Sequence, residues 1–182
     1  MTLLTSMNLT LRRAIATDAP LLRRWDTEPD VEFSGGADDS YDWDVEVVRD
    51  VQWQEIFMAE LDGVAVGVVV LIDALREESH YWGHDVEPGA WAIDIWIGDE
   101  KNRSRGLGTL MMQKSLDRCF QVHRAPVVLI DPLASNFRAI DFYKRIGFAV
   151  EAPRRFGEDD CLVMSIRKES GKIKTRFGEP SE

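Results

Sequence analysis

Residues 102–109, NRSRGLGT, place basic side chains and glycines directly after the apolar run GAWAIDIWIG. A turn of this kind between a strand and a helix is typical of anion-binding sites, because the first N–H groups of a helix lack intrahelical partners. Gly106 and Gly108 let the backbone approach a ligand, and Arg103 and Arg105 add positive charge. The spacing differs from that of a P-loop and from G-x-G-x-x-G. A glycine-containing loop with solvated arginines is the alternative interpretation.

Two aspartates stand near the ends of apolar strands. Strand alternation in AWAIDIWI sets Asp94 on the face opposite the isoleucines, and VVLIDP ends its strand at Asp131. If these strands are parallel neighbours, both carboxylates approach a cleft at the strand ends, where they suit an ammonium group and its proton. A structural cap or an arginine ion pair is the alternative for Asp94. A turn before Pro132 is the alternative for Asp131.

The segment SNFRAIDFYKRIGF predicts a helix with a tyrosine in its second half. Ser135 or Asn136 can cap this helix, and Gly147 suits its C-terminal stop with Phe148 packing back. Tyr143 falls at helical spacing among apolar residues. A core aromatic is the ordinary interpretation of such a residue.

The elements that must position these residues follow an order typical of an α/β domain around one mixed sheet. Two strand-like runs within 54–73 flank Asp62-Gly63, a strong hairpin signal. The acidic, turn-rich segments 26–44 and 76–89 are predicted to be long loops. We expect further strands at 9–14, 90–97, 126–131 and 161–166, and helices at 17–25, 45–53, 107–120 and 135–148.

Length and composition indicate one globular domain, which we place at residues 1–168 with a charged tail at 169–182. No segment approaches the ~20 apolar residues of a membrane helix, and the N-terminus lacks the pattern of a signal peptide. Cys119 and Cys161, the two cysteines, have no metal-binding spacing. They fit a reducing compartment, so we expect a cytoplasmic protein without a membrane partner.

The formal net charge of −10 argues against a general nucleic-acid binder, because neutralising phosphates requires clustered cations. An acidic surface also attracts cationic small molecules and speeds their arrival. Solubility alone is the alternative explanation of the charge.

Aromatic side chains alternate with acids in both expected loops. Phe33, Tyr81 and Trp82 are candidates for substrate binding, and Tyr41 and Trp43 lie among further acidic residues. Aromatic faces beside carboxylates would offer an aminocyclitol a flat wall and partners for its ammonium groups. A satellite hydrophobic cluster beneath the loops is the alternative.

Other chemistries find little support. His80 and His84 lie four residues apart in a loop, without the H-E-x-x-H pattern, so we expect no metal. Cys119 falls among apolar residues of a predicted helix and is expected to be a buried structural thiol. No G-x-S-x-G nucleophile elbow is present.

The spacing R-x-x-G-x-G after a buried strand, followed by a short strand and SNFRAIDFYKRIGF, resembles the GCN5-related N-acetyltransferase (GNAT) superfamily. The resemblance implies a mixed, mostly antiparallel sheet flanked by helices, with splayed central parallel strands. It also implies that the anion is the pyrophosphate of acetyl-coenzyme A, held by N–H groups of residues 106–109, and that an amide near Ile97 polarises the thioester carbonyl. The implied cofactor-binding residues are Ile95, Trp96, Ile97, Arg103, Arg105, Gly106, Leu107, Gly108, Thr109 and Asn136.

Within this superfamily, WAIDIWIG, LIDPLASNFRAIDFYKRIGF and EFSGG are similar to aminoglycoside 6′-N-acetyltransferases. In that family an Asp of the strand and another in the D-P-x-x-S-N turn line the antibiotic site, which corresponds to Asp94 and Asp131. A tyrosine matching Tyr143 protonates the departing thiolate in the superfamily. The resemblance weakens at 28–53 and after Phe148.

The resemblance therefore implies an enzyme that joins acetyl-coenzyme A and a cationic amine in a ternary complex, with direct attack by the amine. The 6′-amine of an aminoglycoside is the expected acceptor, with Asp94, Asp131 and Tyr143 as the catalytic residues. Siderophore precursors, polyamines and protein amines are alternative acceptors, and a non-catalytic acyl-coenzyme A sensor is the alternative class. We expect a monomer or a homodimer.

Overall fold

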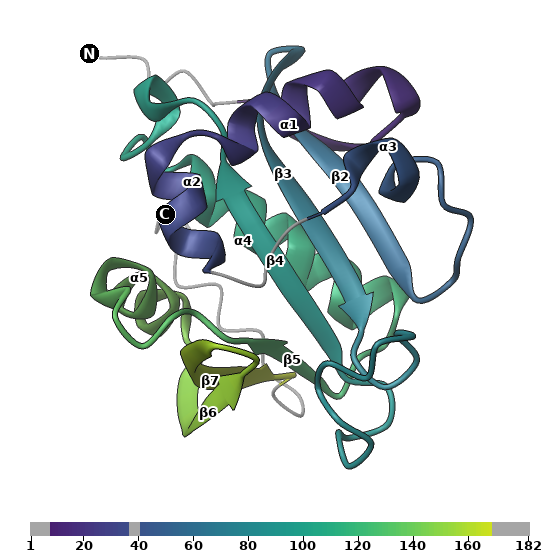
Figure 1. The fold of residues 1–182 in the computed structure, drawn as a ribbon, viewed down its shortest axis with the longest axis vertical. Coiled ribbons are helices and arrows are strands. Elements are labelled where there is room, and N and C mark those ends of the chain that lie inside the picture. Colours follow the sequence, from purple (N-terminus) through teal and green to yellow (C-terminus); the bar gives the residue numbers. More distant parts are fainter. Residues whose placement is uncertain (1–7, 37–40, 169–182) are drawn as a thin grey trace, which may run out of the picture.

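The computed structural model describes residues 8–36 and 41–168, which form one sheet in the order β1-β2-β3-β4-β5-β7-β6 (Figure 1). All neighbouring strands are antiparallel except β4 and β5, which are parallel. The strands are β1 (Leu9–Arg13), β2 (Gln54–Leu61), β3 (Val64–Asp73), β4 (Trp91–Ile97), β5 (Val127–Ile130), β6 (Ala149–Phe156) and β7 (Asp159–Arg167). The helices are α1 (Ala19–Asp26), α2 (Pro29–Gly35), α3 (Trp43–Glu46), α4 (Leu107–Asp117) and α5 (Phe137–Ile146), with short turns η1 (Ala16–Asp18), η2 (Glu100–Asn102) and η3 (Arg118–Val122). The predicted fold class is confirmed.

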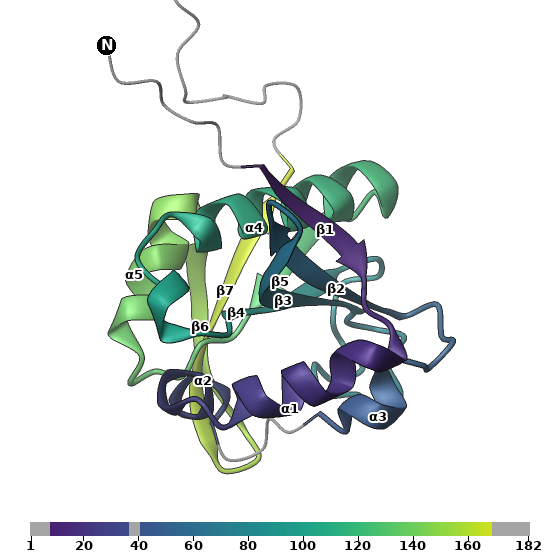
Figure 2. The same cartoon turned by 90° about the horizontal axis from the view of Figure 1, so that it is seen from above.

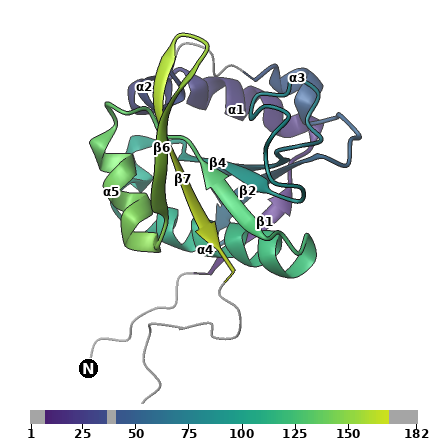
Figure 3. The same ribbon diagram turned by 90° about the horizontal axis from the view of Figure 1, so that it is seen from below.

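Helices cover both faces of the sheet (Figures 2 and 3). The first three helices lie on one face, and α4 and α5 lie on the other. Strand β4 supplies both cores through alternation: Ile93 and Ile95 pack with the α4 side chains, whereas Trp96 packs with α1 and α3. The predicted assignment of faces along this strand is therefore confirmed.

The two central parallel strands pair only at their beginnings. The register joins Trp91 to Val128 and Ala92 to Leu129, and no further β4–β5 pairs occur in the described residues. On its other edge β4 stays paired with β3 as far as Ile97. The edge of β4 that faces β5 is therefore open beyond Ala92, as the splayed strands of the predicted fold require.

Turn chemistry explains several elements that the sequence predicts. Asp62 and Gly63 both have positive φ, 51° and 80°, which is the backbone of a two-residue hairpin turn between β2 and β3. Asn136 caps α5 by accepting a hydrogen bond from the Ala139 N–H at 3.1 Å. Gly147, at φ 120°, ends that helix as expected.

The expected loop 26–44 and helix 45–53 are both wrong in part. Residues 29–35 form α2, which starts with Pro29 at its first position and buries Val31 against the domain. The second helix is the short α3, anchored by the fully buried Trp43, whose indole N–H donates to Asp26 at 2.5 Å. The sequence prediction missed α2 and misplaced α3 because both segments are rich in turn-forming residues. Tertiary contacts rather than local propensity stabilise these helices.

Strand β6 is missing from the sequence prediction. Seven of its eight residues are exposed, so it shows no apolar alternation, and it carries Pro153. Proline is tolerated on an edge strand, and β6 lies at the edge of the sheet beside β7. The predicted tail at 169–182 lies outside the described residues.

A buried carboxylate joins β2 to the end of α4. Glu55 is 6% exposed and binds Arg118 through two hydrogen bonds, Arg13 at 2.6 Å and His123 at 2.8 Å. Burial alone would raise the pKa of Glu55, but the hydrogen bonds from Arg118 and His123 outweigh it and lower the pKa to about 2. The cluster thus ties the sheet to the segment that follows α4.

We predict that Glu55→Gln lowers the free energy of unfolding by about 2 kcal/mol at pH 7, since it removes the buried negative charge that binds Arg118, Arg13 and His123. A carboxyl whose folded pKa is depressed stabilises above its unfolded pKa and loses this effect as pH falls toward its folded pKa. The deficit should therefore shrink between pH 4.5 and about 2. Urea unfolding at pH 7 and pH 3 measures it.

Glu87→Gln is the matched control, because Glu87 pairs with Arg167 on the surface. It should leave the unfolding midpoint unchanged. Equal stability of Glu55→Gln and the wild type at pH 7 would show that the cluster contributes nothing.

Candidate active site

A cleft of about 1300 Å³ opens where β4 and β5 separate. Helix α2, the first turn of α4, α5 and the segment around Tyr81 complete its wall. All the predicted site residues line it except Arg105 and Leu107, namely Phe33, Tyr81, Trp82, Asp94, Ile95, Trp96, Ile97, Arg103, Gly106, Gly108, Thr109, Asp131, Asn136 and Tyr143. The two halves predicted separately, for an anion and for an amine, thus share one cavity.

The glycine turn presents the uncapped start of an 11-residue helix to this cleft. Gly106, at φ 81°, is the N-cap of α4, and no side chain of the described residues caps the helix. Leu107 is fully buried and fixes the turn from beneath. The first N–H groups of α4 are therefore available to an anion, and they fit the pyrophosphate of a coenzyme.

The two glycines of this turn serve different purposes. Gly106 needs its left-handed backbone, and a Cβ there would meet nothing within 4 Å. A Cβ on Gly108 would lie 3.5 Å from Phe142 Cζ and 3.9 Å from Ile97 Cδ1, which are ordinary contacts. The structure thus requires glycine only at 106.

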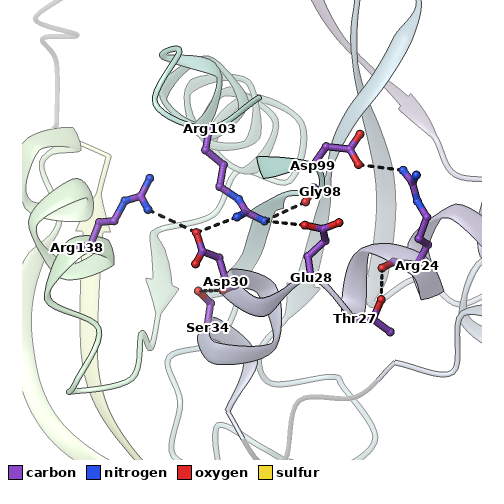
Figure 4. A network of polar contacts seen from close by, with 9 residues as sticks. All are labelled: Arg24, Thr27, Glu28, Asp30, Ser34, Gly98, Asp99, Arg103 and Arg138. Carbon is purple, nitrogen blue, oxygen red and sulfur yellow. Dashed lines mark hydrogen bonds and ion pairs between the residues drawn. The ribbon is translucent and has the colours of Figure 1, made fainter. Parts of the chain in front are cut away.

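The two predicted arginines are engaged within the protein, and Figure 4 shows the contacts of Arg103. The Arg103 side chain, 13% exposed, donates to Asp30 at 2.8 Å and to the Gly98 carbonyl at 3.1 Å, and lies 3.8 Å from Glu28. Arg105 donates to Asn102 at 3.1 Å. Arg103 joins α2 to the glycine turn, so its charge is already countered by carboxylates of that helix.

Asn136 lies where α5 begins and contacts α2 as well. Its Oδ1 caps α5, and its Nδ2 donates to Ser34 Oγ at 3.3 Å. The predicted capping role is confirmed. Its predicted contact with the coenzyme stays a prediction.

Asp94 binds a phenol rather than an arginine. Tyr41 donates a short hydrogen bond to Asp94 Oδ2, and its ring stacks on Trp43 with centroids 4.7 Å apart. Burial raises the pKa of Asp94, and the hydrogen bond from Tyr41 acts in the opposite direction. The sequence analysis considered an arginine as the partner of Asp94, and the structure places the neutral hydroxyl of Tyr41 there.

Asp131 follows the same pattern on the neighbouring strand. Tyr81 donates to Asp131 Oδ2 at 2.6 Å and stacks on Phe156 with centroids 4.3 Å apart. Burial, and then the negative charge of Asp94, raise the pKa of Asp131 to about 7, against the hydrogen bond from Tyr81. The two carboxylates therefore influence each other across the opening between β4 and β5.

Tyr143 projects from α5 into the cleft and packs between Phe142 and Phe148. Within the described residues its hydroxyl has no hydrogen-bond partner. Burial, followed by the charges of Asp94 and Asp131, raises its pKa above the ordinary value. The phenol thus stays protonated and can donate.

Two aromatic walls flank the carboxylates. Tyr41 and Trp96 form one, with the buried Trp43 packed against both rings. Tyr81 and Phe156 form the other, with the buried Trp82 packed edge-on beneath them. The satellite-cluster interpretation therefore applies to Trp82, while Tyr81 at 42% exposure and Phe33 at 55% offer open faces.

Sequence reasoning missed the partners of this site. Tyr41 was one of several loop aromatics, and no spacing linked it to Asp94. Phe156 stands on the unpredicted strand β6, and Arg154 beside it donates to the Trp82 carbonyl at 2.9 Å while its charge favours ionised Asp131. Only a contact across the folded domain reveals these residues.

Two other features bear on the class of protein. In the described residues, no group of three or more metal-ligating side chains comes together. Nor does any helix there combine the length and apolar character needed to cross a bilayer.

A family model described as an acetyltransferase (GNAT) domain matches residues 14–156. The chain belongs to the GNAT acetyltransferase family. Members of this family use acetyl-coenzyme A as cosubstrate, so this GNAT protein is an acetyl-coenzyme A-dependent N-acetyltransferase. The start of α4 and the open edge of β4 are the predicted place for that cosubstrate.

Relatives of this GNAT protein include an aminoglycoside N(6′)-acetyltransferase type 1 from Serratia marcescens, 27% identical, with 93% of this chain and 88% of the relative aligned. A crystal structure of the aminoglycoside acetyltransferase AAC(6′)-Ib with coenzyme A and kanamycin has a TM-score of 0.79 at 21% identity, covering 89% and 96% of the two chains. The spermidine N-acetyltransferase of Vibrio cholerae has a TM-score of 0.64 at 17% identity, covering 87% and 93%. The two structures share the fold of this GNAT protein.

We predict that Gly106→Ala weakens coenzyme A binding about tenfold, because a methyl group is strained at positive φ and turns the helix N–H groups away. Gly108→Ala is the matched control. It should leave binding within about twofold and raise the free energy of unfolding by about 0.5 kcal/mol, through lower backbone entropy of the unfolded chain. Calorimetric titration and thermal unfolding check both variants. Equal loss of binding in both would contradict the distinction between the glycines.

Proposed function

We propose that this enzyme transfers the acetyl group of acetyl-coenzyme A to the 6′-amine of an aminoglycoside. The observation that carries the proposal is the pair of phenol-bound carboxylates, Asp94 and Asp131, in the same cleft as the uncapped start of α4. An amine and a coenzyme bound there would meet at the opening between β4 and β5.

The cleft supports a cationic acceptor with sugar-like rings. Tyrosine hydroxyls leave the charges of Asp94 and Asp131 unneutralised, so both remain partners for ammonium groups. Tyr81 and Phe33 add exposed aromatic faces. Relatives named as aminoglycoside N(6′)-acetyltransferases, and a neighbour crystallised with kanamycin, favour the same acceptor.

Asp131 is the better candidate for the general base. A pKa of about 7 leaves it able to take a proton near neutral pH, directly or through one water. Asp94 on the neighbouring strand would hold and orient the ammonium group. The amine must lose its proton before its nitrogen can form a bond to the thioester carbonyl carbon.

Tyr143 would complete the proton balance. When the carbon–sulfur bond breaks, the thiolate needs a proton. The phenol of Tyr143, which has no hydrogen-bond partner among the described residues, is held protonated by burial and by the two carboxylates. Unpaired backbone groups on the open edge of β4 near Ile97 would polarise the thioester carbonyl. The predicted residues thus divide into amine-holding, proton-accepting and proton-donating groups.

Cell compartment and assembly remain expectations. Cys119 and Cys161 are both buried thiols, which supports the predicted reducing cytoplasm. We retain a monomer or homodimer as the expected assembly.

A thiol-release assay tests the proposed function. We expect acceptor-dependent thiol release from acetyl-coenzyme A with an aminoglycoside that carries a 6′-amine and none with its 6′-hydroxyl counterpart, because the hydroxyl compound lacks the nucleophilic nitrogen at the reacting position. Release with spermidine alone would assign a polyamine acceptor instead. Coenzyme binding without release from any amine would indicate a sensor.

The pH dependence of kcat/KM should report Asp131. Activity is expected to rise as pH increases through about 7, where this carboxyl loses its proton. Asp94→Asn removes the charge that raises the pKa of Asp131, so this limb should move about one unit to lower pH while turnover falls at least about tenfold. Tyr81→Phe removes a hydrogen bond that lowers the same pKa, so its limb should move to higher pH.

Coenzyme A titration serves as the control for these variants, since neither residue contacts the glycine turn. Coenzyme affinity should stay within about twofold of the wild type. If the pH profiles of kcat/KM for Asp94→Asn and Tyr81→Phe shifted in the same direction, the assignment of Asp131 as the base would be refuted.

A further inference from the structure

Helix α2 borders the cleft and is held by arginines from two different segments. Arg103 lies at the beginning of the glycine turn, Arg138 lies in the first turn of α5, and both reach the Asp30 carboxylate of α2 (Figure 4). One carboxylate thus stands between two guanidinium groups beside the proposed coenzyme site. The two arginines nevertheless differ in how firmly they are bound.

Arg103 is fixed in place. Its side chain is 13% exposed and has three acceptors, Asp30, Glu28 and the carbonyl oxygen of Gly98. Moving it would leave a largely buried cation short of partners, which is unfavourable. Arg103 is therefore a permanent link between α2 and the turn.

Arg138 is weakly held. Its side chain is 68% exposed, lies 3.7 Å from Asp30 and, among the described residues, donates only a long hydrogen bond of 3.3 Å to Ser104 Oγ. Ser104 belongs to the glycine turn, and both residues line the cleft together with Gly106. An exposed ion pair at this distance contributes little, so Arg138 can exchange partners at small cost.

We propose that Arg138 binds a phosphate of the coenzyme and that Asp30 occupies its guanidinium when the coenzyme is absent. The inference rests on the proposed function, which places a pyrophosphate at the start of α4. A phosphate offers more charge and a better match to a guanidinium than one half-exposed carboxylate does. Asp30 and the coenzyme therefore compete for the same side chain.

Competition gives the two residues opposite effects on affinity. Removing Arg138 removes a ligand of the phosphate, whereas removing the charge of Asp30 removes the competitor. If the ion pair merely shaped the cleft, removing either residue would weaken coenzyme binding. The sign of the Asp30 effect thus separates the two accounts.

Calorimetric titration with coenzyme A provides the test. Arg138→Ala should weaken binding about tenfold, and Asp30→Asn should strengthen it about threefold. Asp30→Asn combined with Arg138→Ala should bind like Arg138→Ala alone, because no guanidinium remains to be released. Lys144→Ala, an exposed cation at the far end of α5, is the matched charge control and should bind like the wild type.

Wild-type affinity in Arg138→Ala or weaker binding in Asp30→Asn would overturn the inference. So would tighter binding of the double variant than of Arg138→Ala alone, because the effect of Asp30→Asn would then act through Arg103. Both side chains are more than half exposed, so thermal unfolding should confirm intact folding in each variant. Wild-type protein that binds no coenzyme A would overturn the proposed function as well.

3′-Dephospho-coenzyme A identifies the phosphate. If Arg138→Ala loses affinity for coenzyme A but not for the dephospho form, the guanidinium binds the 3′-phosphate. Equal loss for both ligands assigns the pyrophosphate. Each result supports Arg138 as a phosphate-binding residue.

Discussion

The separation of β4 from β5 after two residue pairs is the constraint on which the rest of the site depends. Apolar packing of Ile93 and Ile95 against α4 and continued pairing with β3 hold β4 straight, while Pro132 and α5 carry the chain away from β5. The opening exposes strand backbone whose polar groups need a partner. It also sets two carboxylates and the start of α4 around one cleft.

The two carboxylates on the amine side of the cleft, Asp94 and Asp131, are bound by tyrosines and can still bind an ammonium group. Several arginines elsewhere have carboxylate partners, as Arg118 has Glu55 and Arg103 has Asp30. Asp94 and Asp131 instead accept hydrogen bonds from phenols, which hold their geometry without cancelling their charge. Burial, and then the charge of Asp94, raise the pKa of Asp131, and the two carboxylates together favour a cationic ligand between them.

Sequence reasoning predicted the elements that local chemistry determines. The Asp62-Gly63 hairpin, the alternation around Asp94 and the Asn136 cap follow from turn types, strand period and helix ends. It missed elements that depend on distant contacts, such as α2 held by Arg103 and the exposed edge strand that carries Phe156. For the same reason, sequence reasoning identified both aspartates but did not identify the tyrosines as their partners. A hydrogen bond between residues 50 or more positions apart produces no recognisable spacing in the sequence.

The central claim is that the acceptor amine meets the thioester at the opening between β4 and β5. A crystal structure with coenzyme A and an aminoglycoside tests it most directly. The account predicts the pyrophosphate at the first turn of α4, the sulfur beside β4 and Tyr143, and the 6′-nitrogen within about 3 Å of an Asp94 or Asp131 oxygen or of a water bound to it. An aminoglycoside with no amine near either carboxylate would contradict the account.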